Sequence, residues 1–335
     1  MPADYPPHGE KSKILRRETM ASSVMATGDP QLHGATADMY GSKLEAPVFP
    51  GSNADNKYWH ELREVVEVQK ARRSKAEPNS VNRWPDLWQG YDLEEIAQLV
   101  HDEYPASLQQ SMLYGLFKEG VKLNYDIIPF RSVVDFVATE VRMAKLNTWV
   151  VDTIAPISFM MKWHTGMPRP EEIAWLIHSG AFTGRDGVPA DLQNDIRDFK
   201  MDHATNFTAY PEGSPTHPSW PAMHSAASTL SFWLPVVVKL TPAQYCEALR
   251  VDYAVSYART VAGVHYPQDN YAGLNLGKEV ILEKFPDMMY ERYGADPEAV
   301  RSRMEYLKFD WHAFDSWDCT IGGIPAADWL GEMAA

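Results

Sequence analysis

Apolar side chains recur at helical spacing through most of this 335-residue sequence, and this pattern constrains the fold more than any other feature. Apolar residues three and four positions apart lie on one face of an α-helix, which can then pack against other helices. Strand-like alternation is nearly absent, so the sequence predicts an all-α helical bundle. The helical pattern covers residues 58–75, 93–104, 107–123, 128–163, 171–180, 222–234, 241–263, 269–285 and 296–309.

The sequence divides into an N-terminal arm and one helical domain. Residues 1–50 are rich in Pro, Gly, Ser and other small polar residues, so we expect an extended or disordered arm that adds nothing to the core. Residues 51–335 are predicted to form a single α-helical domain. Within it, Pro156 predicts a break in its helix, and Thr241 and Asp269 are expected to cap the helices that follow them.

Charge and composition exclude several classes of protein. The formal net charge of −14 argues against nonspecific nucleic-acid binding, because such binding needs a basic face. The most apolar run, residues 225–240, is shorter than the about 20 residues that cross a bilayer, and Pro235 interrupts it, so we expect no membrane insertion. The first 23 residues lack the apolar stretch of a secretion signal. Cys246 and Cys319 are too few for a disulfide framework or a cysteine metal cluster.

The first candidate site segment is residues 162–170, where a helix is expected to end. Lys162 closes the helix, Gly166 and Pro168 terminate it, and Arg169 follows on rigid backbone between two prolines. Lysine offers a point charge and arginine a planar fork, so the two side chains can hold one oxyanion together. Alternatively, these cations only complement the dipole at a helix carboxyl end.

The second segment, residues 213–229, carries two histidines among prolines just before an apolar helix. Ser219 or Thr216 is expected to cap that helix, and Pro221 suits its first turn, which places His224 in the same turn. A histidine fixed at a helix start is what an anion site with proton transfer requires.

The backbone at this helix start is a candidate anion site. The amides of Ala222, Met223 and His224 are expected to point outward along the positive end of the helix dipole, where anions bind. The alternative is that His224 is a surface histidine and that His217 is a loop residue without a chemical role.

The third segment is residues 258–273. Arg259 lies near the end of a helix, Gly263 turns the chain out of it, and His265 follows in a short connection. A carboxylate four residues after a histidine can accept a hydrogen bond from one ring nitrogen, so Asp269 would leave the other nitrogen as a ligand or nucleophile. Alternatively, Asp269 only caps its helix and His265 is a core histidine.

Together, the three segments resemble the spaced signature of the vanadium-dependent haloperoxidases, which is shared with the type 2 phosphatidic acid phosphatases. The resemblance covers about residues 129–285 and implies a helical bundle of the haloperoxidase and acid phosphatase type. The matching elements are Lys162, six residues and Arg169-Pro170; Pro221 to His224; and Arg259, five residues, His265, three residues and Asp269.

The resemblance implies a vanadate cofactor, whose site phosphate can also occupy. In that family, a lysine and two arginines hold the anion, and these correspond to Lys162, Arg169 and Arg259. The second histidine of the family, here His265, binds vanadium in the peroxidases or attacks phosphorus in the phosphatases.

The resemblance also implies the roles of the remaining side chains. His224 would act as acid and base, and Asp269 would orient His265. Residues 213–226 are most similar to the algal bromoperoxidases, in which a histidine at the position of His217 is associated with bromide oxidation. The expected partners are hydrogen peroxide, a halide and a small organic acceptor, and we expect a homo-oligomer.

Two positions depart from the family pattern, because its Pro-Ser-Gly-His reads Pro221-Ala222-Met223-His224 here. Ala222 lacks a hydroxyl donor. Since a hydrogen bond to a charged group contributes about 1.5 to 3 kcal/mol, we expect vanadate to bind more weakly by about one to two powers of ten. Met223 keeps its amide, but its side chain crowds the site or requires a different backbone angle. The alternatives are a soluble acid phosphatase with His265 as nucleophile, and a helical homologue without anion binding that serves as a binding or structural module.

Overall fold

The computed structural model describes residues 40–41, 43–44, 56–76, 90–101, 109, 112–113, 115–116, 122–124, 139–305 and 308–330. The protein is mostly helical, which confirms the predicted all-α class. The helices are α3 (Asn56–Arg73), α4 (Leu93–His101), α7 (Thr139–Thr165), α8 (Pro170–His178), α9 (Ala190–Arg197), α10 (Met223–Ala227), α11 (Leu230–Val237), α12 (Pro242–Val261), α13 (Pro267–Tyr293), α14 (Pro297–Met304) and α15 (Ala326–Leu330).

Short 3-10 turns and short strands connect these helices. The turns are η3 (Gly184–Asp186), η4 (Ala204–Phe207) and η6 (Trp311–Ala313). Strands β1 (Lys122–Leu123) and β2 (Val238–Lys239) form an antiparallel pair, and β3 (Phe314–Asp315), β4 (Thr320–Ile321) and β5 (Ile324–Pro325) form an antiparallel sheet in that order.

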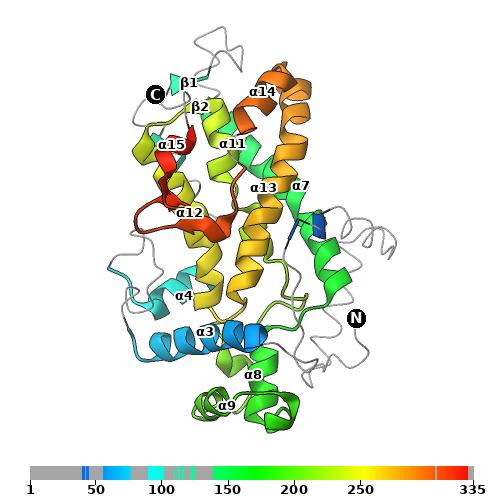
Figure 1. Ribbon diagram of the computed structural model, residues 1–335, viewed down its shortest axis with the longest axis vertical. Coiled ribbons are helices and arrows are strands. Elements are labelled where there is room, and N and C mark those ends of the chain that lie inside the picture. The colour runs from blue at the N-terminus through cyan, green and yellow to red at the C-terminus, as the bar shows by residue number, and fades with distance from the viewer. Residues whose placement is uncertain are drawn as a thin grey trace.

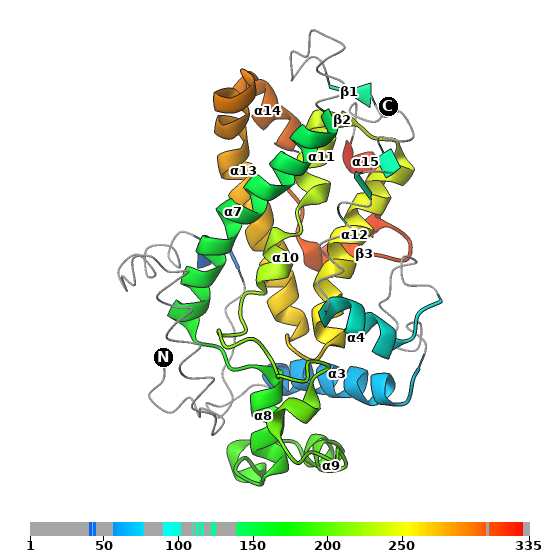
Figure 2. The ribbon, with the colours of Figure 1, turned by 180° about the vertical axis from the view of Figure 1, so that it is seen from behind.

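The short helix α10 lies at the centre of the bundle, in contact with α7, α12 and α13 (Figures 1 and 2). Helices α12 and α13 run beside each other, and α3 crosses their ends near α8 and α9 (Figure 1). Helix α11, which follows α10, is buried along its whole length. The chain therefore places the start of α10 in the interior, between three long helices.

Two glycines let α10 approach α13 closely. A Cβ at Gly273 would overlap the carbonyl oxygen of Ala222, and a Cβ at Gly277 would overlap that of Ala226. The two glycines are one helical turn apart on α13, so they form a smooth strip against which the backbone of α10 packs.

Local sequence signals explain the bounds of α12. The Thr241 hydroxyl accepts a hydrogen bond from the Gln244 amide at 3.3 Å, and the Gln244 side chain accepts one from the Thr241 amide at 2.9 Å. Pro242 fits the first helical position, and Gly263 leaves the helix with a φ of 76°. The predicted cap at Thr241 is confirmed.

The predicted break at Pro156 is wrong, because α7 is one helix from Thr139 to Thr165. A proline within a helix removes the hydrogen bond to the carbonyl four residues earlier. Both Pro156 and Asp152 are exposed, so water can hydrate the carbonyl group of Asp152.

The single helix expected over residues 222–234 is instead two helices, α10 and α11. The buried carboxylate of Asp252, on α12, accepts hydrogen bonds from the amides of Leu230 and Ser231 at 3.1 and 2.8 Å and from the Ser231 hydroxyl at 2.7 Å. Asp252 thus stabilises a new helix start at Leu230. This cap comes from a distant segment, so helical spacing alone did not indicate it.

The N-terminal region and the cysteines also differ from expectation. Within the predicted arm, Tyr40 and Leu44 are buried in the hydrophobic core, although most of residues 1–50 lie outside the described part of the chain. Cys246 and Cys319 form a disulfide, which the sequence analysis did not anticipate. No helix in the described ranges has the apolar run that a membrane span requires. The single-domain organisation of residues 51–335 stays a prediction.

Candidate active site

Lys162 is buried in the last turn of α7 and faces the loop before α10. Its Nζ donates to the carbonyl oxygens of Pro218 and Ser219 at 2.9 and 2.7 Å. Gly166, with a φ of 68°, ends the helix as predicted. Burial and the positive charge of Arg169 lower the pKa of Lys162 well below its usual range, and the charge of Asp269 opposes this shift.

Arg169 is fully buried directly before α8, and its guanidinium connects the two loops that carry histidines. It donates to the carbonyl oxygens of His217 at 3.1 Å and Val264 at 2.6 Å. It also lies 2.8 Å from Nε2 of His265 and 3.1 Å from Nδ1 of His217. The planar group thereby fixes both rings relative to each other.

The contact with Arg169 determines the tautomer of His265, because a guanidinium can only donate. Nε2 of His265 must accept, so its Nδ1 carries the proton and donates to Oδ2 of Asp269 at 3.1 Å. Nδ1 of His217 lies 3.1 Å from the Arg169 guanidinium, a donor, and 3.2 Å from the carbonyl oxygen of Pro218, an acceptor, so these two contacts make opposite demands on this nitrogen. Burial, followed by the charges of Arg169 and Lys162, lowers the pKa of His265 well below its usual range. The imidazole is therefore neutral, with its lone pair on the Arg169 side.

Asp269 joins several parts of the cluster. Besides His265, its Oδ2 accepts from the Tyr266 amide at 3.0 Å and from the Ser219 hydroxyl. Burial raises the pKa of Asp269 to about 6, although the Ser219 hydrogen bond and the charge of Lys162 lower it. Asp269 was predicted to be the cap residue of α13, and this prediction is wrong. Tyr266 takes the cap position, and Asp269 is the third residue of the helix.

His224 lies in the first turn of α10, as expected, and keeps part of its surface accessible. Burial, followed by the charges of Arg259, Lys162 and Arg169, lowers its pKa well below the usual range. Arg259 is buried in the last turn of α12, and its Nη1 donates to the Tyr210 hydroxyl at 3.0 Å. The charges of all three cations therefore act on His224.

His217 lies beside the cluster, in the loop before α10. Its ring meets the Phe159 ring edge-on at a centroid distance of 4.8 Å, and it is buried. Burial, followed by the charges of Lys162 and Arg169, lowers the pKa of His217 well below the usual range. The structure therefore brings the three predicted cations, His217 and His265 into one buried region, with the partly accessible His224 at the start of α10.

The start of α10 differs from the prediction. Ala222 takes the cap position, and neither Ser219 nor Thr216 caps the helix; Pro221 lies before the helix rather than in its first turn. The amide of Ala222 donates to the backbone carbonyl of Asp269 at 2.9 Å, so it is not available to an anion. Met223 is the first helical residue and is partly exposed.

Several supporting residues were missed. Glu172 accepts a hydrogen bond from the Arg169 amide at 2.9 Å, and Glu171 accepts one from the Ser214 amide at 2.8 Å. Both glutamates are buried. A Glu three residues after the cap residue of a helix is a known capping signal. Arg169 is the cap residue of α8, so the role of Glu172 could have been predicted from the sequence. The contact with Ser214 spans a loop and had no such signal.

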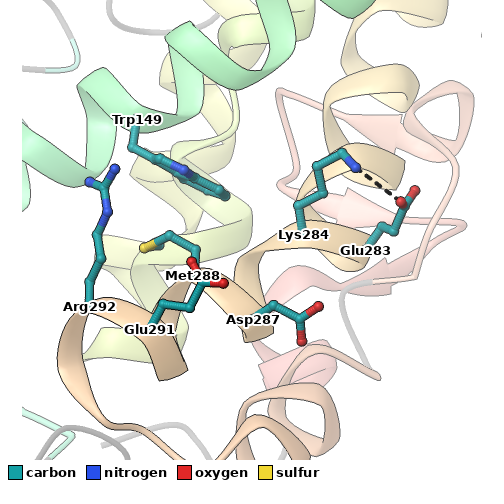
Figure 3. A pocket seen from close by; sticks show the side chains of 7 residues that line it. All are labelled: Trp149, Glu283, Lys284, Asp287, Met288, Glu291 and Arg292. Carbon is teal, nitrogen blue, oxygen red and sulfur yellow. Dashed lines mark hydrogen bonds and ion pairs between the residues drawn. The ribbon is translucent and has the colours of Figure 1, made fainter.

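A pocket of about 280 Å³ between α7 and α13 contains none of these residues (Figure 3). Trp149 from α7 lies over Met288 on α13, and charged side chains surround them (Figure 3). Lys284 donates to Glu283 at 3.1 Å, and Asp287, another wall residue, pairs with an arginine of α14 at 2.8 Å. Because wall charges pair with neighbouring side chains, this pocket is a weaker candidate than the buried cluster.

The cluster is suited to an oxyanion rather than to a metal cation. Among the described residues, no group of three or more His, Cys, Asp or Glu side chains could hold a metal ion. Lys162, Arg169 and Arg259 are buried around neutral imidazoles with Asp269 as the carboxylate among them, so a negatively charged ligand would balance the remaining positive charge. Searched against protein-family models and curated proteins, the sequence matches none of them.

Proposed function

We propose that this chain is a vanadate-dependent haloperoxidase with the helical bundle of the haloperoxidase and acid phosphatase type. It would use hydrogen peroxide to oxidise bromide or iodide to a hypohalous-acid equivalent, which halogenates a small organic acceptor. One observation carries the proposal: the Arg169 guanidinium contacts both His217 and His265 in a buried region that also holds Lys162 and Arg259.

The residues present fit a bound vanadate. Lys162, Arg169 and Arg259 would hold its oxygen atoms, and the amide of Met223, in the first turn of α10, suits a further donor. Nε2 of His265 carries a lone pair that would ligate the vanadium atom in place of the hydrogen bond that it accepts from Arg169 at 2.8 Å. Phosphate has a similar shape and charge, so it would occupy the same site.

When bound, vanadate would supply a Lewis acid that polarises hydrogen peroxide and makes one of its oxygen atoms electrophilic. The side chains of the chain bind the ligands and move protons. His224 is neutral because its pKa is lowered, so it can accept a proton from hydrogen peroxide. Asp269 keeps the His265 proton on Nδ1, which leaves Nε2 free of a proton.

An acid phosphatase would make different demands on the same histidines. His265 could attack phosphorus through Nε2, but His224 would have to start protonated in order to donate to the leaving group. Burial and the charges of three cations lower the pKa of His224, and a bound anion would offset those cations in either enzyme. The similarity of residues 213–226 to the algal bromoperoxidases supports the peroxidase over the phosphatase.

A homologue without catalysis is favoured by a separate observation. Ala222 replaces the serine of the family pattern, so the anion would lack one hydroxyl donor. The backbone amide of Ala222 already donates to the backbone carbonyl of Asp269 at 2.9 Å. Such a protein would keep the bundle and serve as a binding module. Direct measurement of vanadate binding separates this candidate from the two enzymes.

The decisive experiment is a pair of assays on one preparation, each with and without added orthovanadate. We expect vanadate-dependent bromination of a dye in the presence of hydrogen peroxide, and little hydrolysis of an aryl phosphate. Phosphate release without bromination would establish the phosphatase. The absence of both activities, with no bound vanadate by vanadium-51 NMR, would establish the binding module.

Matched histidine variants add a control. His265→Ala should abolish bromination, because it removes the vanadium ligand, while circular dichroism remains that of the unaltered protein. His60→Ala replaces an exposed histidine on α3 and should leave bromination unchanged. Retained bromination in folded His265→Ala would exclude the assigned role.

A further inference from the structure

A second pocket, of about 590 Å³, lies beside the β3–β5 sheet and is independent of the candidate active site. Its walls come from α12, α13, η6, strands β3 and β4, the loop between these strands and the turn before β5. The side chains that matter are Tyr253, Tyr271, His312, Asp315, Trp317 and Asp318.

Aromatic rings form much of this pocket. Tyr271 stacks on His312 with ring centroids 4.5 Å apart, and Tyr253 packs edge-on against Phe314 at 5.8 Å. Trp317 is 43% exposed, which leaves a large apolar ring at the pocket without protein covering it. The faces of such rings carry negative electrostatic potential and attract cations.

The acidic side chains that line the pocket are Asp315 and Asp318. None of the described lining residues is Lys or Arg, and the guanidinium of Arg250 lies behind the wall, where it donates to the carbonyl oxygens of Ser316 and Trp317. Asp315 accepts hydrogen bonds from the amides of Trp317 and Asp318 at 2.8 and 3.2 Å, which fixes the carboxylate against the backbone of the loop. A ligand that enters therefore meets aromatic surface and negative charge together.

The pocket is also held in shape from behind. The disulfide between Cys246 and Cys319 ties the loop to α12. Arg250, also on α12, donates to the carbonyl oxygens of Ser316 and Trp317 at 2.9 and 2.7 Å. Because the disulfide and these hydrogen bonds already hold the loop, little conformational entropy would be lost when a ligand binds. A preorganised site binds more tightly than a flexible one for this reason.

We propose that this pocket binds a small organic cation, namely an ammonium group with apolar substituents. The substituents would contact the rings of Trp317, Tyr253 and Tyr271, and the positive charge would be balanced by Asp315 and Asp318. An anion would be repelled by the two carboxylates. A hydrated metal ion would gain nothing from the aromatic walls.

The test compares choline with 3,3-dimethylbutan-1-ol, its neutral counterpart of the same shape, by isothermal titration calorimetry on the full chain. We expect choline to bind at least about tenfold more tightly, because only choline has the charge. Added salt should weaken choline binding. Equal affinity for the two compounds, or no binding of choline at millimolar concentration, would overturn the proposal.

Two pairs of matched variants locate the site. Trp317→Ala should weaken choline binding by about tenfold, whereas Ile324→Ala removes an exposed apolar residue of β5 that does not line the pocket and should have no effect. Asp318→Asn should weaken it, whereas Asp328→Asn on α15 should not. Unchanged choline affinity in both pocket variants would refute the location. The comparison of the two ligands on the unaltered protein stays valid if a variant does not fold.

Discussion

Replacing Gly273 by alanine should damage the candidate active site more than the fold. The new Cβ would overlap the Ala222 carbonyl and lie 2.6 Å from Cβ of Ser225, both at α10. Carbon atoms pack at about 3.5 to 4 Å, so α10 must shift by about 1 Å. The strain of overpacking, about 1 to 3 kcal/mol, is partly offset by the about 1 kcal/mol that alanine adds to helix stability.

The shift of α10 would move His224 and the amide of Met223, which are in its first turn. A displacement of about 1 Å at reacting groups can lower a rate by about 100-fold. We therefore expect Gly273→Ala to lower the free energy of unfolding in urea by no more than about 2 kcal/mol, while bromination falls by about 100-fold.

Gly184→Ala is the matched control. A Cβ there meets nothing within 4 Å, and the glycine lies in η3, outside the bundle core. Both its stability and its bromination rate should match those of the unaltered protein. A folded Gly273→Ala protein with full bromination would refute the reasoning that the close approach of α10 and α13 positions the site.

Three further predictions concern protonation and covalent ties. The pKa of Lys162 is lowered, and a bound anion favours the charged form of Lys162. The affinity for orthovanadate, measured by calorimetry, should therefore fall by up to about tenfold per pH unit as the pH rises above that pKa. An affinity that does not change with pH would contradict this prediction. Burial raises the pKa of Glu172 from 4.5 to about 8, so the folded state keeps the Glu172 proton at pH values where the unfolded chain has lost it. The free energy of unfolding in urea should therefore fall as the pH rises from 4.5 to about 8, by up to about 1.4 kcal/mol per pH unit. Glu172→Gln should flatten this slope, and an unchanged slope in that variant would exclude Glu172 as its source. Replacing Cys246 and Cys319 by serine should lower the unfolding free energy by about 4 kcal/mol, because the bridge spans 73 residues; an equal urea midpoint would argue against that bridge.

Helical spacing was sufficient for α12 because its caps are local. Thr241 and Gly263 flank α12 within a few residues, so the sequence shows both ends directly. Spacing failed between α10 and α11, where Asp252 provides hydrogen-bond acceptors from another helix. It also failed at Pro156, because exposure to water depends on which face of α7 packs inward. These errors arise from contacts between distant segments.

The candidate site shows the same division. The hydrogen bond between His265 and Asp269 follows from a spacing of four residues, and the expected ends of α7 and α12 correctly place Lys162 and Arg259. Residue type did not reveal that Arg169 contacts two histidines, since its fork reaches loops 48 and 96 residues away.

Asp269 explains why these distant loops meet at one place. Its carboxylate binds the ring of His265 and the hydroxyl of Ser219, while its backbone carbonyl binds the amide of Ala222. A single residue of α13 therefore fixes one histidine and both ends of the short segment that leads into α10. Lys162 holds the same segment from α7 through the carbonyl oxygen of Ser219. The amide of Ala222 is not available to an anion because its hydrogen bond to Asp269 fixes the position of α10, which carries His224. The site therefore has one hydrogen-bond donor fewer for the anion, but the position of His224 is set before the anion binds.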